Sequence, residues 1–311
     1  MSIVFSNSSD RVTLTGFIGL GYMGAAIARR LLIAGFPLMV HDVRSEACAP
    51  FADEGVKVAT DPRDLAGTAE VVFLCLPSIE AAREVVAKLA GGRRLRVVVE
   101  TSTVGPAAIS EMATLLAQHG ASMLDAPVSG GPPAAEAGTL SLMYSGDAAT
   151  IGRVLPQLEA MAGRRFDVGR APGLAQVCKL VNNAISAAGM IAACEATVVG
   201  VKAGLDPTTL LAAINAGSGR NAATLDKFPR SILPGTFDWG GPMGLMLKDL
   251  SLFMEQARAC GVPTALAPAT LQVWEEAVRR NGFDADLSRV IRHLEIDAGV
   301  EVRQAARGAA E

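Results

Sequence analysis

The first half of the chain alternates short apolar runs with amphipathic stretches. The continuous apolar runs at 71–76 and 97–99 are typical of strands that are buried on both faces of a sheet. Residues 23–34 have apolar side chains at helical spacing and are followed by Gly35, which predicts a helix and its end. Alternation of this kind is typical of a parallel sheet covered by helices. Other strands are predicted at 14–18, 38–40, 56–59, 123–126 and 140–144, and other helices begin at Pro62, Ser78 and Pro106.

The second half of the chain has helical periods and no convincing strand. The change near residues 168–173 predicts two domains, one at 1–170 and an all-helical one at 171–311, with residues 1–10 as a loose tail. The length of 311 residues agrees with two domains of about 150 residues each. The helices are predicted at 174–203, 207–217, 243–260, 264–280 and 287–298.

The composition narrows the class of protein. Half of the residues are apolar and 19% are charged, which excludes intrinsic disorder. Lys plus Arg number 28 against 31 for Asp plus Glu, so no basic surface indicates a nucleic-acid partner. The apolar stretch 184–204 is interrupted by Glu195 and Lys202, so we expect no membrane-spanning helix. Residues 1–10 lack the basic start and apolar core of a secretory signal.

Cysteine and histidine usage argues against disulfide or metal chemistry. The five cysteines are odd in number and none forms a C-x-x-C pair, while the three histidines are scattered. We therefore expect mostly buried free thiols, no metal site and a cytoplasmic location.

A glycine-rich loop follows the first predicted strand and opens the first predicted helix. Glycines at this spacing permit a tight turn and a close approach of the backbone to a pyrophosphate. The helix N-terminus offers N–H groups and a positive dipole end to the same anion. The alternative is a plain turn. The loop consists of Gly19, Leu20, Gly21, Tyr22, Met23 and Gly24.

An acidic residue ends the second predicted strand. Asp42 lies 21 residues after Gly21, where a carboxylate can bind both ribose hydroxyls of NAD and would repel a 2′-phosphate. Arg44 complicates this prediction because it could reach such a phosphate. We favour NAD over NADP.

Two further turns follow buried strands and are placed to line a cofactor site. Leu76 and Pro77 follow one strand, and Ser102 and Thr103 follow the next. Ligands of open α/β sheets bind beyond the carboxyl ends of the strands. The alternative is that both segments are ordinary strand-to-helix turns.

A second set of polar residues lies further along the chain. The loop 125–131 ends in Ser129, Gly130 and Gly131, whose hydroxyl and N–H groups could hold a carboxylate. Lys179 and Asn183 share one face of a mostly apolar predicted helix, with Asn182 beside them.

Two more polar features leave their function open. Lys248 and Asp249 interrupt another apolar helix, where a surface charge pair is the alternative. The glycine-rich loop from Asn215 to Asn221 could contact a ligand.

Taken together, these motifs resemble those of the β-hydroxyacid dehydrogenase family, which includes 3-hydroxyisobutyrate dehydrogenase, tartronate semialdehyde reductase and threonate dehydrogenase. The likeness covers residues 15–299. The resemblance implies a Rossmann-type, doubly wound, mostly parallel sheet followed by an all-α domain that forms homodimers or homotetramers. Four segments appear in the family's order, at 16–24, 125–131, 173–183 and 248–250.

The resemblance also implies roles for matching residues. Lys179 would be the catalytic acid/base and Asn183 would help to hold the substrate. Lys248 would lie near the nicotinamide, with Asp249 supporting it. The substrate carboxylate would be held by Ser129, Gly130 and Gly131, and the cofactor would contact Ser102 and Thr103.

Two positions bear on preference within the family. Relatives that prefer NADP often carry an Asn-Arg pair where this chain has Asp42 and Val43, which fits NAD better. Asn221 stands where many members have serine.

The predicted activity is reversible hydride transfer between NAD(P) and the hydroxyl carbon of a small β-hydroxy acid. Imine reductases share the fold and usually lack the lysine, so Lys179 argues against them. A non-catalytic dinucleotide-binding protein is a further alternative. A decarboxylating enzyme of the 6-phosphogluconate type would need a much longer helical domain.

Overall fold

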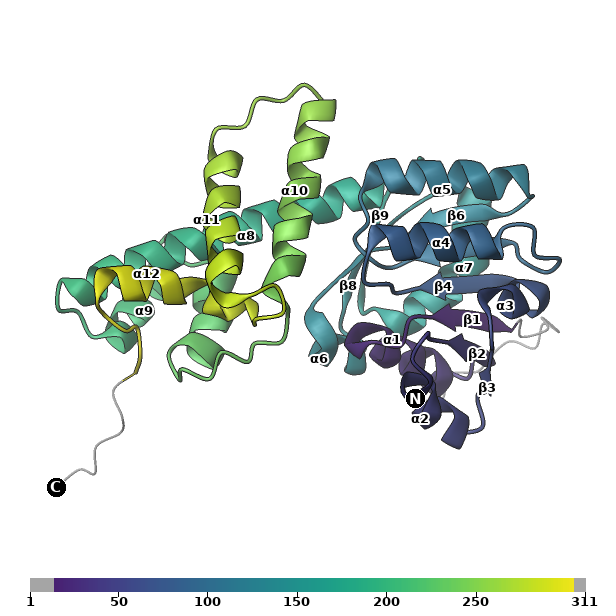
Figure 1. Cartoon of the computed structure of the whole chain (residues 1–311), viewed down its shortest axis with the longest axis horizontal. Helices are drawn as coiled ribbons and strands as arrows, with labels where there is room; N and C mark the ends of the chain where they lie inside the picture. The colour runs from purple at the N-terminus through teal and green to yellow at the C-terminus, as the bar shows by residue number, and fades with distance from the viewer. Residues whose placement is uncertain (1–13, 305–311) are drawn as a thin grey trace. The chain divides into compact units, whose positions relative to one another are not determined.

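The computed structural model describes residues 14–304, so the loose tail expected at residues 1–10 lies outside the described part (Figure 1). The chain divides into two compact units, the first ending at Gln176 and the second beginning at Val177. The predicted domain boundary after residue 170 falls between the last strand and the longest helix, and the domain ranges stay a prediction.

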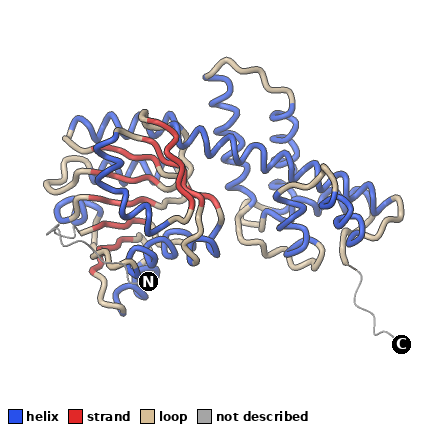
Figure 2. Tube along the Cα trace, turned by 180° about the vertical axis from the view of Figure 1, so that it is seen from behind, coloured by secondary structure: helices blue, strands red, loops and turns tan. Residues whose placement is uncertain are grey.

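The first unit is built on one mostly parallel sheet, seen as the red strands of Figure 2. Its order is β3-β2-β1-β4-β5-β6-β8-β7, with β9 paired to β8. All pairs from β3 to β6 are parallel, whereas β8 runs antiparallel to both β6 and β7. The strands are β1 (Thr15–Ile18), β2 (Leu38–His41), β3 (Lys57–Val58), β4 (Val71–Leu74), β5 (Val97–Glu100), β6 (Ser122–Asp125), β7 (Val128–Ser129), β8 (Ser141–Ser145) and β9 (Arg164–Gly169).

Helices cover both faces of this sheet, and each face has its own apolar core. One core joins α1, α2, α6 and α7 to side chains such as Phe17 and Phe73. The other joins α3, α4 and α5 to side chains such as Ile18 and Val98. The predicted α/β, doubly wound class is confirmed. The helices are α1 (Tyr22–Ile33), α2 (Ser45–Asp53), α3 (Pro62–Thr68), α4 (Ile79–Leu89), α5 (Pro106–Gln118), α6 (Gly131–Glu136) and α7 (Ala148–Met161).

Helix starts follow the predicted caps. The side chain of Asp61 accepts a hydrogen bond from the N–H of Arg63 ahead of Pro62, and Ser78 caps α4 in the same way. These caps fix the chain direction after β3 and β4.

The second unit is helical, as expected. Within its described residues, 177–304, no strand occurs, and the isolated bridge from Pro242 to Asp286 is the one β-type pairing. Its core contains side chains from every helix of the unit, with Trp274 and Phe228 among the largest. The helices are α8 (Leu174–Lys202, which begins in the first unit), α9 (Pro207–Ala216), the π-helix η1 (Ala223–Ile232), α10 (Met243–Ala259), α11 (Leu266–Asn281), the 3₁₀-helix η2 (Leu287–Val290) and α12 (Ile291–Ala298).

Helix α8 is long and apolar enough to cross a membrane, judged by length and composition alone. The expectation that residues 184–204 cannot pass as a spanning helix is not met by the whole helix, because Leu174–Lys202 contains an 18-residue window with at most two charged side chains. That window has a mean hydropathy of 1.7, and 39% of it is buried. Core helices pass the same test, and Met190, Cys194 and Val198 of α8 do pack into the core of the second unit.

Candidate active site

The glycine loop between β1 and α1 is shaped by close backbone contacts. Gly19 has a φ of +93°, and a Cβ there would lie 2.2 Å from the carbonyl oxygen of Cys75. A Cβ on Gly24 would lie 1.9 Å from the carbonyl oxygen of Gly19. Gly21, in contrast, has no atom within 4 Å of its Cβ position and caps α1 without a side-chain hydrogen bond. The open space lies at Gly21, where a pyrophosphate would have to approach the first turn of the helix.

The other residues of the loop divide into buried and exposed. Leu20 is buried, Met23 is half-buried, and Tyr22 is 91% exposed. Tyr22 is thus a large aromatic side chain of the glycine loop that is exposed to solvent.

Asp42 is connected directly to this loop. Its Oδ2 accepts a hydrogen bond from the N–H of Leu20 at 2.7 Å. Its Oδ1 accepts from the N–H and the Nε of Arg44, at 2.9 and 3.2 Å. Burial by itself raises the pKa of Asp42, but the hydrogen bonds from Arg44 and Leu20 outweigh it, so the pKa lies below its ordinary value. The carboxylate is therefore ionised at neutral pH.

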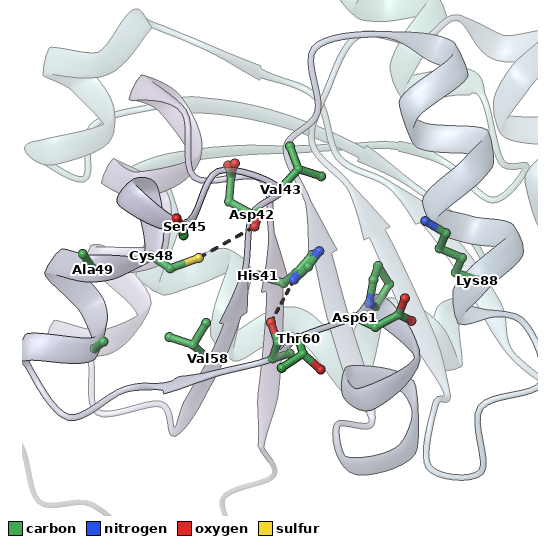
Figure 3. Close-up of a pocket in the computed structure, with 13 residues that line it drawn as sticks. His41, Asp42, Val43, Ser45, Cys48, Ala49, Val58, Thr60, Asp61 and Lys88 are labelled. Carbon is green, nitrogen blue, oxygen red and sulfur yellow. Dashed lines mark hydrogen bonds between the residues drawn. The ribbon is translucent and has the colours of Figure 1, made fainter.

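A cavity of about 590 Å³ adjoins Asp42 at the end of β2 (Figure 3). It is bounded by α2, by the segment after β3 and by Lys88 of α4. His41 lies on its wall with Nδ1 2.9 Å from the carbonyl oxygen of Ala59. Val43, at its rim, is 93% exposed. The exposure of Val43 has no signature in the sequence, because an apolar residue after a strand gives no sign of lying open to solvent.

The two predicted turns after β4 and β5 meet. The hydroxyl oxygen of Ser102 accepts a hydrogen bond from the N–H of Leu76 at 2.7 Å. Leu76, Ser102 and Thr103 are half-buried, and Pro77 is exposed. Since β4 and β5 are parallel neighbours, both turns leave the same edge of the sheet.

The loop of Ser129, Gly130 and Gly131 joins β7 to α6. Gly130 has a φ of +134° and Gly131 a φ of +73°, both of which favour glycine. A Cβ on Gly130 would lie 2.7 Å from the Cβ of Ala134. Ser129 and Gly131 are half-buried and Gly130 is exposed, so the loop is accessible to a small ligand.

Lys179 of α8 is buried, with 8% of its surface exposed. Burial lowers the pKa of its amine, the charge of Asp249 opposes this effect and the charge of Lys248 adds to it. The net result is a pKa below the ordinary lysine value. A buried amine of this kind gives up its proton more readily than a surface lysine.

Four polar residues accompany Lys179 in the second unit. The Nδ2 of Asn183 donates to Oδ2 of Asp249 at 2.6 Å. Lys248 pairs with Oδ1 of Asp249, with 2.9 Å between Nζ and the oxygen. Asp249 is 7% exposed, so the alternative of a plain surface pair does not fit. Asn182 is exposed and donates to Oδ1 of Asn183 at 3.0 Å.

Asn221 has a structural position. Its Oδ1 accepts from the N–H groups of Ala223 and Thr224 at the start of η1, at 2.8 and 3.2 Å. Its Nδ2 donates to the carbonyl oxygen of Gly189 in α8 at 3.2 Å. The side chain is thereby committed to joining η1 to α8.

The cysteines differ in part from expectation. Cys48 and Cys194 are buried, Cys75 and Cys178 are half-buried, and Cys260 is exposed. Burial raises the pKa of the Cys75 thiol to about 12. All five are free thiols. Among residues 14–304, no group of three or more His, Cys, Asp or Glu side chains could hold a metal ion.

A buried polar cluster at the start of α8 has no signature in the sequence. Asp125, Ser145 and Gln176 are each 0% exposed. Ser145 donates to Oδ1 of Asp125 at 2.5 Å, and Oδ2 of Asp125 accepts from the N–H of Gln176 at 3.0 Å. Burial raises the pKa of Asp125 despite these hydrogen bonds. The partners are far apart in sequence, so no local pattern could reveal them.

The predicted site residues thus form two groups, one in each unit. The first unit holds the glycine loop with Asp42, the turns after β4 and β5, and the loop after β7. The second unit holds Lys179, Asn183, Lys248 and Asp249.

Two family models together cover most of the chain. Residues 15–169 match the NAD binding domain of 6-phosphogluconate dehydrogenase. Residues 173–294 match the model described as NAD-binding of NADP-dependent 3-hydroxyisobutyrate dehydrogenase.

Individual relatives agree with these models. The 2-(hydroxymethyl)glutarate dehydrogenase of Eubacterium barkeri is 32% identical, over 92% of this chain and 96% of its own. The NAD-dependent L-serine dehydrogenase of Pseudomonas aeruginosa is 34% identical, over 88% and 95%. The solved 3-hydroxyisobutyrate dehydrogenase of Mycobacterium tuberculosis, in a structure with L-serine, is 32% identical with a TM-score of 0.81, over 91% and 99%.

The fold and these matches define an NAD(P)-dependent oxidoreductase with a Rossmann-type domain. The chain belongs to the β-hydroxyacid dehydrogenase family, which confirms the resemblance seen in its motifs. An imine reductase from Streptomyces aurantiacus has a TM-score of 0.61 at 24% identity, which is a likeness of fold alone.

Proposed function

We propose that this protein is an NAD(P)-dependent dehydrogenase that moves a hydride between the nicotinamide and the hydroxyl carbon of a small β-hydroxy acid. The observation that carries the proposal is the buried amine of Lys179, which lies within the family's catalytic motif beside Asn183 and Asp249. Its lowered pKa suits a group that must both accept and donate a proton.

The glycine loop and Asp42 fit a dinucleotide. Gly21 leaves the space that a pyrophosphate needs, and Asp42 offers an ionised carboxylate at the end of β2. We propose NAD as the preferred cofactor, since the Asp42 carboxylate would repel a 2′-phosphate. Arg44 supports this preference, because its side chain is already engaged with Asp42. The remaining proposed cofactor contacts come from the turns after β4 and β5, at Leu76, Pro77, Ser102 and Thr103.

Lys179 carries the proton step. When bound, the nicotinamide supplies the hydride acceptor or donor. During oxidation, the neutral amine of Lys179 takes the proton of the substrate hydroxyl. During reduction, its ammonium form returns a proton to the oxygen.

The remaining residues hold the substrate. Ser129 and the N–H groups of Gly130 and Gly131 bind its carboxylate, as expected for a turn that presents its backbone donors. Asn183 binds the substrate and is oriented by its hydrogen bond to Asp249. Lys248 would lie near the bound nicotinamide, as the resemblance implies, and it pairs with Asp249.

A homodimer or homotetramer in the cytoplasm is part of the same proposal. Support for an assembly comes from apolar side chains of α8 that stay exposed in the single chain, namely Val181, Ile185 and Val199.

The test is a panel of small β-hydroxy acids and amines, assayed for NADH and NADPH formation. Lys179→Ala should reduce turnover by orders of magnitude while NAD still binds. Lys202→Ala is the matched control, because Lys202 is an exposed lysine of the same helix that donates to the carbonyl oxygen of Ala298. Activity confined to amines would favour an imine reductase, and binding without any turnover would favour a non-catalytic protein. An intact Lys179→Ala enzyme would refute the acid/base role.

A further inference from the structure

Gln176 makes hydrogen bonds that join separate parts of the first unit. Its Oε1 accepts from the N–H groups of Val104 and Gly105, at 2.9 and 3.1 Å. Its Nε2 donates to the carbonyl oxygen of Ser102 at 3.1 Å. The side chain is completely buried, and Val104 is also buried. One carboxamide therefore fixes the backbone of the segment that follows β5.

That segment is the proposed cofactor turn. Ser102, whose carbonyl oxygen binds Gln176, accepts a hydrogen bond from the N–H of Leu76 through its hydroxyl oxygen. The N–H of Ser102 donates to Oε1 of Glu100 at 2.8 Å. Gln176 thus holds one turn directly and the turn after β4 through Ser102.

The backbone of Gln176 is fixed from the other side. Its N–H donates to the buried carboxylate of Asp125, and the preceding N–H, that of Ala175, donates to the hydroxyl oxygen of Ser145 at 3.0 Å. Asp125 ends β6, four residues before Ser129. A carboxylate at the N-terminus of α8 also interacts favourably with the helix dipole.

Lys179 lies three residues after Gln176 in α8, which is about one helical turn. The first turn of the helix that carries the proposed acid/base is therefore held by the proposed cofactor turn through the side chain of Gln176. The backbone N–H of Gln176 also binds Asp125, which ends the strand that leads to the proposed carboxylate loop.

We propose that Gln176 is a positioning residue, whose carboxamide orders the Ser102–Gly105 turn for the dinucleotide and whose backbone helps to fix the first turn of α8. This inference rests on the proposed function. Gln176 touches no reacting atom, and it acts on the dinucleotide through the Ser102–Gly105 turn. Misplacement of reacting groups by about 1 Å can cost about 100-fold in rate. The loss of the hydrogen bonds of one buried side chain can therefore change the rate measurably.

The main variant is Gln176→Met, which keeps the length of the side chain and removes all three hydrogen bonds. We expect the dissociation constant of NAD to rise about 10-fold and kcat to fall about 10- to 100-fold. The matched control is Gln157→Met. Gln157 is a buried glutamine of α7 in the same unit, and its Oε1 has no hydrogen-bond partner. For this control, kcat and NAD affinity should stay within about twofold of wild type.

A second variant, Gln176→Glu, separates positioning from simple packing. A protonated carboxyl can donate to the carbonyl oxygen of Ser102 as the amide does, whereas a carboxylate cannot. The ionisable groups around it are Glu100 of β5 and Asp125 of β6, with Lys179 on its own helix. Burial and the two acids favour the protonated form. We expect activity near wild type at acidic pH and a new loss of kcat/KM as pH rises.

The outcomes are distinct. Changes in both NAD affinity and kcat for Gln176→Met, with a new pH limb for Gln176→Glu, support the inference. Wild-type kcat and NAD affinity in a folded Gln176→Met protein, with only a lower Tm, overturn it. If the wild-type protein oxidises no hydroxy acid, the proposed function fails, and the affinity of the variants for NAD, measured by fluorescence titration, still decides the role of Gln176 in the cofactor turn.

Discussion

The glycine loop allows a sharp test, because Gly21 and Gly24 should fail for different reasons when each is replaced by alanine. Gly21 has φ −66° and ψ −176°, which any residue adopts, and no atom lies within 4 Å of its Cβ position. Gly21→Ala should therefore fold normally. Its methyl group would fill the space that the pyrophosphate approaches, so we expect the dissociation constant of NAD to rise at least about 10-fold.

Gly24→Ala should damage the fold itself. The new Cβ would lie 1.9 Å from the carbonyl oxygen of Gly19, and real contacts essentially never fall under 3.0 Å, so α1 must move away from the loop. Because the nearest atom belongs to the backbone and cannot swing aside, we take the upper end of the usual overpacking cost, about 3 kcal/mol, against a gain of about 1 kcal/mol in helix propensity, which leaves a net loss of about 2 kcal/mol. At about 2–4 °C per kcal/mol, the expected net change is a Tm lowered by a few degrees.

Gly152→Ala is the control for both variants. Gly152 lies exposed in α7, has no atom within 4 Å of its Cβ position, and belongs to the same unit. This substitution should stabilise the protein slightly and leave NAD affinity unchanged. Thermal unfolding by circular dichroism and titration of NADH fluorescence measure the two effects separately. Wild-type affinity in Gly21→Ala would show that the dinucleotide binds elsewhere, and an unchanged Tm in Gly24→Ala would contradict the loop geometry.

Two further predictions follow from charges in the two units. Burial lowers the pKa of Lys179, and oxidation needs its neutral amine. In a pH–rate profile, kcat/KM for oxidation should therefore rise as pH increases through that lowered pKa, while the rate of reduction falls. An oxidation rate that declines over this range would contradict the acid/base role. Asp42→Asn removes the charge that opposes a 2′-phosphate and weakens the hold on Arg44. The ratio of kcat/KM for NAD to kcat/KM for NADP should therefore fall at least about 10-fold. An unchanged ratio would show that other residues select the cofactor.

Much of the scaffold could be predicted because its signals are local. The starts of α3, α4 and α9 follow from Asp61, Ser78 and Asp206, whose side chains accept hydrogen bonds from the first turn of each helix. The strands β4 and β5 are continuous apolar runs since both faces of the sheet are covered.

Other elements gave no such signal. Strand β9 is mostly exposed at the edge of the sheet, so its sequence, RRFDVG, does not alternate. Helix α7 contains Pro156, and the π-helix η1 contains Pro229, which weakens a helical pattern. Residues 128–136 form the two-residue strand β7 and the short α6, where glycine and proline favour the prediction of a loop.

The candidate site shows the same division between local and distant signals. Spacing alone placed Lys179 and Asn183 on one face of a helix, and both are buried. The importance of Gln176 could not be seen in sequence, because its side-chain partners Ser102, Val104 and Gly105 lie more than 70 residues away. Asn221 looked available to a ligand, since a hydrogen bond to Gly189 in another helix has no sequence signature.

The hydrogen bond from the N–H of Leu20 to Asp42 has a consequence for coenzyme exchange. The residue proposed to discriminate between the two dinucleotides therefore also accepts a hydrogen bond from the loop proposed to bind their shared diphosphate. A substitution that only removes the carboxylate would weaken the binding of both coenzymes, because the N–H of Leu20 would lose its acceptor. A variant designed to prefer NADP therefore has to supply a new hydrogen-bond acceptor for that N–H. Under the proposed function, the choice between the coenzymes and the affinity for either of them therefore depend on the same carboxylate.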